Sequence, residues 1–382
     1  APVPAHAEVP SVAAESYREL VDLDGAHSVR WAKPRQSPLS VEPDRLDIEI
    51  LALVAGMRHV LSSQIHRRFN PDRAATTTQR RLKRLSDAGW VRRLQFHRRD
   101  GGGTPMCYVI AEAGLELLRA QDRIDGSQEE GARGSPAEER RLRQARHDVH
   151  VSGWALALGQ TLGGASVRLR GPVESVLSPP LHSAAGGRTA LGPRELRLPG
   201  GRTPHEFLST DEAGRRNEVE RFETVRPDAI IEVSGVDVLM ELDDRLPADR
   251  GAAKLERYDH LLAGWSVCTK RYGQRSAVTP VVVFVCRDRA RARECARQAD
   301  RVLTACRAYA GEYPADWEYP GRAGVVWASE RDVHEGLLQA YGVQRLPPEV
   351  RVAVAHGNPR AREPEVRAGS LTTIGAAWRR ER

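Results

Sequence analysis

The stretch RPDAIIEVSGVDVLMELDDR, residues 226–245, decides the fold of the larger part of this chain. Two apolar runs are joined by a Ser-Gly turn, which is the pattern of two adjacent strands. Asp228 lies at the start of the first run, and Glu241 and Asp243 lie at the end of the second. Because side chains alternate along a strand, Glu241 and Asp243 share one face. We therefore expect both carboxylates to point into one cavity.

The segments around these strands predict a mixed α/β (α+β) domain with the core order αβββαβ. Helices are expected at 140–162, 254–263 and 290–303, and strands near 217–223 and at 228–233, 236–242, 280–286 and 324–329. A Gly/Pro-rich insertion at 178–204 shows no periodicity. The expected boundaries are a flexible leader at 1–43, a first domain at 44–120, a linker at 121–138, this domain at 139–345 and a basic tail at 346–382.

The first domain has the element order of a winged helix-turn-helix. Helical periodicity covers 45–57, 61–69 and 76–90, and two alternating segments flank the loop DGGGT at 100–104. Residues 61–100 hold eleven Lys or Arg against three acids, mostly on the third helix and the wing. These elements would enter the major groove and contact the flanking phosphates. The residues expected to bind DNA are Thr77, Gln79, Arg80, Arg81, Lys83, Arg84, Arg92, Arg93, Arg98 and Arg99. The alternatives are a solvated charged face and a protein-binding winged helix.

Composition narrows the classes of function. The net charge of +7 favours a polyanionic partner, and no apolar run is long enough to span a bilayer. The five cysteines are odd in number and lack CxxC spacing, which argues against a disulfide framework or a zinc site and favours the reducing cytoplasm. With DNA as the expected partner, we expect a cytoplasmic, nucleoid-associated protein. There is no GxxxxGK[ST] motif, so an ATP-driven replicase or helicase is not expected.

Pro227-Asp228 before one strand and Glu241-Leu242-Asp243 at the end of the next resemble the PD-(D/E)xK, or restriction-endonuclease-like, fold. The resemblance implies a divalent cation, Mg²⁺ or Mn²⁺, held by Asp228, Glu241 and Asp243, in a metal-dependent endodeoxyribonuclease. Carboxylate oxygens suit Mg²⁺, and a bound metal activates water for attack on phosphate. The chain departs from the pattern where Asp243 replaces the expected lysine. Lys254, at the start of the following helix, would take that catalytic role.

A second resemblance covers most of the chain. The N-terminal winged helix, RPD (226–228), ELD (241–243) and KLERY (254–258) together resemble the replication-relaxation family of actinobacterial plasmids and other mobile elements. In that family an acidic strand end of this kind precedes a helix carrying Lys and Tyr, so Asp243 would be its normal residue. The resemblance implies a role in the replication or relaxation of mobile-element DNA.

These features predict a DNA-binding protein of a mobile element that engages its site through the winged helix and nicks DNA with a nuclease-like domain. One alternative is a catalytically inactive accessory protein or transcriptional regulator with the same fold. Another is a defence nuclease that recognises foreign DNA. The expected partners are double-stranded DNA, a second copy of the chain, and replication or transfer proteins of the element, with no membrane.

Overall fold

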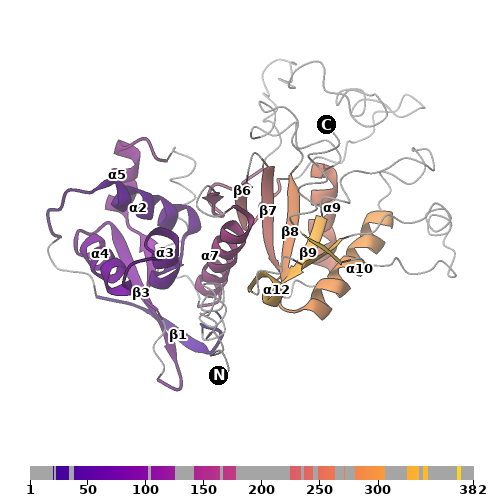
Figure 1. Ribbon diagram of the computed structural model, residues 1–382, viewed down its shortest axis with the longest axis horizontal. Helices are drawn as coiled ribbons and strands as arrows, with labels where there is room; N and C mark the ends of the chain where they lie inside the picture. Colours follow the sequence, from indigo (N-terminus) through magenta and orange to yellow (C-terminus); the bar gives the residue numbers. More distant parts are fainter. Residues whose placement is uncertain are drawn as a thin grey trace, which may run out of the picture. The chain divides into compact units, whose positions relative to one another are not determined.

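The fold is taken from a computed structural model of the whole chain (Figure 1). The structure describes residues 20, 23–33, 38–101, 105–124, 142–163, 167–177, 224–233, 236–243, 248–262, 271, 280–305, 325–334, 339–342 and 368–370. Contacts divide the chain into two units, which are described separately below. The first contains residues 1–174, 228–231 and 330–338, and the second contains 175–227, 232–329 and 339–382. None of the helices in the described part combines the length and hydropathy needed to cross a membrane.

Three helices begin the first unit, as the sequence predicts. They are α2 (Arg45–Met57), α3 (Ser62–Phe69) and α4 (Ala75–Asp87). A capping box starts α2, in which Asp44 accepts from the backbone N–H of Asp47 at 2.8 Å and Asp47 accepts from that of Asp44 at 3.0 Å. Gly89, at φ 78°, follows α4 in the left-handed conformation that favours glycine. These local signals explain why the helix boundaries could be read from the sequence.

The sheet of the first unit has the strand order β1-β3-β4-β2. Strand β3 (Val91–Arg98) pairs with β4 (Cys107–Ile110) along its first half, and β4 also pairs with the short β2 (Val60–Leu61). The second half of β3 pairs with β1 (Ala26–Trp31), and Figure 1 shows β1 beside it. We assigned these N-terminal residues to the flexible leader, so that part of the prediction is wrong. Strand β3 therefore lies between the N-terminal strand and its expected hairpin partner β4.

Two further helices and the short strand β5 follow in the first unit. Helix α5 (Glu112–Ala120) follows β4, and helix α7 (Leu142–Gly163) buries Trp154 completely. We expected α7 to open the second domain, yet it belongs to the first unit. Strand β5 (Arg168–Arg170) leads into Gly171, where an added Cβ would lie 2.2 Å from the carbonyl oxygen of Gly56. The backbones therefore approach too closely there for any larger residue.

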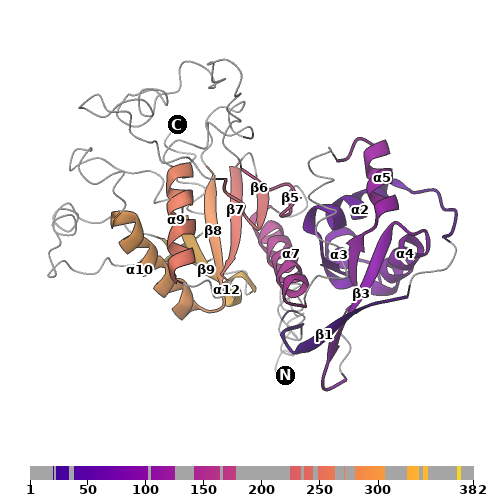
Figure 2. The same cartoon turned by 180° about the vertical axis from the view of Figure 1, so that it is seen from behind.

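A parallel core of three strands forms the second unit. Strands β7 (Val236–Asp243), β8 (Val281–Cys286) and β9 (Val325–Ser329) are paired in parallel, and their side chains are almost all buried. Such continuous apolar runs are typical of parallel strands covered by helices. The connecting helices are α9 (Ala248–Leu262) and α10 (Arg289–Ala305), which Figure 2 shows together in front of these strands. The α/β (α+β) class predicted from the sequence is confirmed.

The remaining elements extend or join this core. Strand β10 (Gln339–Gly342) pairs antiparallel with β9, and β11 (Ala368–Ser370) pairs antiparallel with β10. The prediction missed both, and β11 lies in the segment assigned to the basic tail. Strand β6 (Ala229–Val233) shares its residues between the units, and α12 (Glu330–His334) belongs to the first. The strand expected near 217–223, the insertion at 178–204 and most of the linker at 121–138 lie outside the described residues.

Candidate functional site

The exposed face of α4 carries the polar residues that we predicted would read DNA. Leu82 and Leu85 are buried on the opposite face together with Thr78. The residues left exposed are Thr76, Thr77, Gln79, Arg80 and Lys83. Lys83 also pairs with Asp87 at 2.5 Å, one turn further along the helix. Since surface pairs of this kind contribute little, Lys83 can exchange Asp87 for a phosphate at small cost.

Two other predicted DNA-binding residues on α4 face the protein. Arg81 pairs with Asp44 at 2.7 Å and with Asp47 at 2.5 Å, and Arg84 also bonds to Asp47. The Asp47 side chain is fully buried. Partial burial raises the pKa of Asp44, but the hydrogen bonds from Arg81 and from the backbone of Asp47 outweigh it and lower the pKa overall. Arg81 and Arg84 thus tie α4 to the start of α2, and only part of the predicted cluster faces solvent.

The arginines of β3 and its loop also divide into two groups. Arg92 lies over the ring of Trp31 with its guanidinium carbon 3.8 Å from the ring centroid, a cation–π contact between β3 and β1. Arg98 bonds to Asp100 through two nitrogens. Arg93 is half-buried and Arg99 is exposed. Arg92 and Arg98 thus contact neighbouring side chains, and Arg99 faces solvent.

A buried polar network centred on α7 links several elements of the first unit. Asp148 bonds to His59 Nδ1 at 2.7 Å and accepts from Gln144 at 2.7 Å. His147, on the same helix, has Nδ1 3.7 Å from Asp148 and Nε2 3.9 Å from Asp228, the predicted metal ligand. Burial raises the pKa of Asp148, but the nearby His147 and the hydrogen bonds with His59 and Gln144 outweigh it and hold the pKa well below its ordinary value. Asp228 thus lies beside a histidine that the sequence did not pair with it.

This network makes the stability of the first unit depend on acid pH. A carboxyl group whose folded pKa is depressed stabilises the fold above its ordinary pKa, 3.8 for Asp148, and loses that contribution as the pH falls further. We expect Asp148→Asn to destabilise the first unit at pH 7 and to flatten the acid limb of its unfolding profile. Urea unfolding between about pH 7 and 2, read by hydrogen exchange of α7, measures both effects. The exposed Asp72→Asn is the matched control, and equal profiles for the two variants would contradict the prediction.

The second unit brings together Glu241 and Lys254, two of the residues that we predicted to be catalytic. The Glu241 side chain is fully buried, and its Oε2 accepts from Lys254 Nζ at 2.5 Å. Its other oxygen, Oε1, accepts from the hydroxyl of Tyr258, which is also buried. Lys254 and Tyr258 are one turn apart on α9, so one helix face supplies both donors. Each oxygen of Glu241 therefore has a protein donor.

Asp243 shares its strand face with Glu241 but has different partners. It accepts from Arg291 Nε at 2.6 Å and Nη2 at 3.2 Å, and Cys295 Sγ lies 3.5 Å away. Arg291 and Cys295 are one turn apart on α10, a spacing that the sequence contains but that we did not connect to Asp243. Hydrogen bonding to Cys295 and burial raise the pKa of the Cys286 thiol, which lies in the same cluster. The acids of β7 thus have separate surroundings, with Glu241 against α9 and Asp243 against α10.

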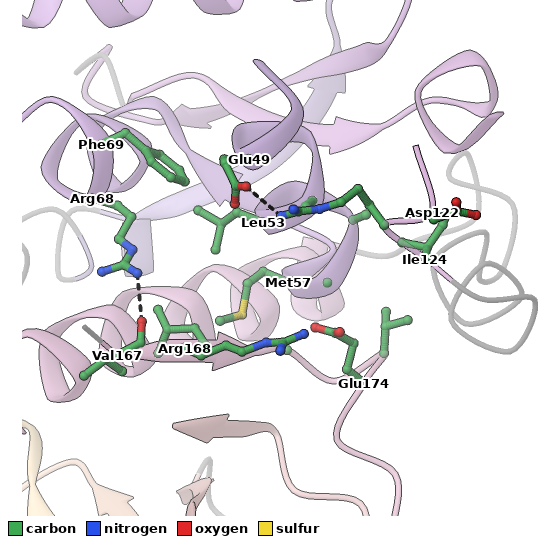
Figure 3. Close-up of a pocket in the computed structure, with 17 residues that line it drawn as sticks. Glu49, Leu53, Met57, Arg68, Phe69, Asp122, Ile124, Val167, Arg168 and Glu174 are labelled. Carbon is green, nitrogen blue, oxygen red and sulfur yellow. Dashed lines mark hydrogen bonds and ion pairs between the residues drawn. The ribbon is translucent and has the colours of Figure 1, made fainter. Parts of the chain in front are cut away.

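A pocket of about 550 Å³ lies in the first unit, away from the exposed face of α4 (Figure 3). Charged residues of both signs line it, and they contact their neighbours. Arg68 donates to the backbone oxygen of Val167 at 2.8 Å, and Arg123 pairs with Glu49 at 2.7 Å. We assign no ligand to this pocket.

The described residues thus define a mixed α/β protein with an exposed polar helix face and buried carboxylates at the end of a parallel strand. The model of the replication-relaxation family matches residues 51–278, more than half of the chain, and the chain belongs to this family. No curated protein and no solved structure matches it.

Proposed function

We propose that this protein binds double-stranded DNA in the replication or relaxation of a plasmid or other mobile element. The observation that carries the proposal is the exposed row on α4, where Thr76, Thr77, Gln79, Arg80 and Lys83 stand opposite the buried leucines. Membership of the replication-relaxation family supports the biological setting. In this reading α4 enters the major groove, and Arg99 contacts the backbone beside it.

The arrangement around α4 supports a winged helix-turn-helix. The helices α2, α3 and α4 precede β3 and β4, and β2 joins the same sheet through β4. His66 of α3 bonds to Thr78 of α4 at 3.0 Å, and Asn70 bonds to the same hydroxyl at 3.1 Å. These contacts fix the turn between the two helices. A winged helix requires a recognition helix that is held in place, here α4, to present its side chains to a groove.

A second candidate function is metal-dependent nicking of DNA in a PD-(D/E)xK-like centre, which the close approach of Lys254 to Glu241 favours. The predicted ligands do not all fit Mg²⁺, which takes oxygen ligands and keeps several waters. Glu241 is buried and accepts from α9 through both oxygens, and Asp243 lies beside the sulfurs of Cys286 and Cys295, which are not ligands for Mg²⁺. Asp228, whose side chain is about one-fifth exposed, is the more open carboxylate. We therefore favour a DNA-binding protein without nuclease activity.

One assay separates the two candidates. Supercoiled plasmid carrying the element's origin is incubated with the protein in Mg²⁺, in Mn²⁺ and in EDTA, and both retardation and nicking are scored. We expect retardation in all three conditions and no nicking. Metal-dependent nicking that is lost in both Asp228→Ala and Glu241→Ala would instead establish the nuclease. A protein that neither retards nor nicks the plasmid would refute DNA binding.

A further inference from the structure

A second cluster of ligand-type side chains lies where the parallel strands of the second unit end. Asp243 is the last residue of β7, Cys286 is the last residue of β8, and the two are directly paired in the parallel ladder. Neighbouring residues in register place their side chains on the same face of a sheet. Cys295, near the start of α10, approaches from the helix above this face. A carboxylate oxygen and the two sulfurs lie within 4.8 Å of one another.

We propose that Asp243, Cys286 and Cys295 form a Zn²⁺-binding site. Two thiols with one carboxylate form a ligand set that suits zinc and not magnesium, because sulfur is a soft ligand. Three protein ligands leave the fourth tetrahedral position for water or another ligand. The location agrees with the general preference of α/β sheets for binding ligands beyond the carboxyl ends of their strands.

The charges around the cluster also suit zinc. Binding requires both thiols to release their protons to solvent, so two thiolates balance the ion. The remaining charge of Asp243 is balanced by Arg291, which holds both carboxylate oxygens. A donor behind a ligating carboxylate fixes its orientation, as is usual around protein metal sites. Arg291 would therefore act as an outer-sphere partner of the ion.

The site also has an entrance. Cys286 is fully buried, but Cys295 is half-buried, and the side chain of Arg291 is about one-third exposed. The ion would reach the cluster along α10. Once bound, it would connect the ends of β7 and β8 to the first turns of α10. The sequence did not reveal this site because its cysteines, nine residues apart on a strand and a helix, lack the short spacing of a zinc motif.

The test uses Co²⁺ as a spectroscopic substitute for Zn²⁺ on the full chain, stripped of metal and kept reduced. We expect one equivalent of Co²⁺ to produce thiolate-to-metal absorption in the near ultraviolet, which Zn²⁺ abolishes by displacement. Cys295→Ser and Asp243→Asn should each weaken Co²⁺ binding by at least about tenfold. Zn²⁺ should raise the unfolding temperature of the wild type more than that of either variant.

Two controls make the result decisive. Cys107→Ala removes a buried thiol of the first unit and should keep the Co²⁺ absorption. Glu294→Gln changes α10 beside Cys295 without removing a proposed ligand and should also keep it. Since Cys286→Ser alters a fully buried strand residue and can prevent folding, the half-buried Cys295 is the deciding position. An unchanged spectrum in Cys295→Ser, or a Cys286–Cys295 disulfide in the protein as isolated from cells, would overturn the proposal.

Discussion

Replacement of Lys254 by Met is expected to lower the free energy of unfolding of the second unit by about 2–3 kcal/mol. Glu241 is fully buried, and Lys254 is the cation that the structure places on it, at 2.5 Å. Removing one partner of a buried ion pair typically costs about 3–5 kcal/mol, because the other charge stays buried. One-quarter of the Lys254 side chain is exposed, so water can reach the variant site and reduce this cost.

The measurement must report on the second unit alone, because two units need not unfold in one transition. Hydrogen exchange of the β7 and β8 amides gives that local free energy. Arg297→Met, which breaks an exposed pair with Glu294 on α10 of the same unit, is the matched control and should change stability by less than about 0.5 kcal/mol. Adding Glu241→Gln to Lys254→Met should restore most of the loss. No recovery in the double variant would mean that Lys254 stabilises α9 by packing and not by its charge.

The parallel strands of the second unit could be predicted because their sequences are almost uniformly apolar. The predicted strand at 280–286 corresponds to β8, and that at 236–242 to β7. Helix α9 was predicted to begin at Lys254 but begins at Ala248. Its first turn, ADRG, contains no apolar periodicity that could mark the boundary. Periodicity therefore located the elements better than their ends.

Long-range pairing explains what the sequence did not show. Strand β1 has no signal of its own and gains its hydrogen bonds from β3, about 65 residues away. Arg81 and Arg84 look like groove-binding residues in the sequence because a charged residue on a helix gives no indication of its partner. Asp44 and Asp47, which bind them, lie more than 30 residues earlier in the chain, at the start of α2. Only the three-dimensional structure distinguishes Arg81 and Arg84, which pair within the protein, from the exposed Arg80.

The candidate site could be predicted only where its residues lie on elements that are adjacent in the sequence. The sequence placed Glu241 and Lys254 in one catalytic site because they lie on a strand and on the helix that comes next, and the structure pairs the two side chains. Asp243 pairs with Arg291, which lies 48 residues away and after another strand. Nothing in the triplet Glu241-Leu242-Asp243 distinguishes a carboxylate that awaits a metal from one that is held by an arginine. That distinction depends on α10.

Replacing Arg80 and Lys83 together by Ala is expected to weaken binding to duplex DNA about 30-fold at 0.15 M salt. Both side chains stand on the exposed face of α4. Each phosphate contact on B-DNA adds about 0.9 to the slope of log K against log salt, so the loss of two should flatten that slope by about 1.8. Fluorescence anisotropy of a labelled duplex over a salt series measures both quantities in one titration.

Two arginine variants show whether α4 itself reads the duplex. Arg119→Ala removes an exposed charge from α5 and should leave both the affinity and the slope nearly unchanged. Arg84→Ala should lower the stability of the first unit, because it removes a partner of the buried Asp47, while the slope for the folded protein stays close to that of the wild type. If Arg119→Ala flattens the slope as much as the loss of Arg80 and Lys83 together, binding follows overall charge and α4 is not the reading helix. A flattened slope in Arg84→Ala would mean that its ion pair with Asp47 opens when DNA binds.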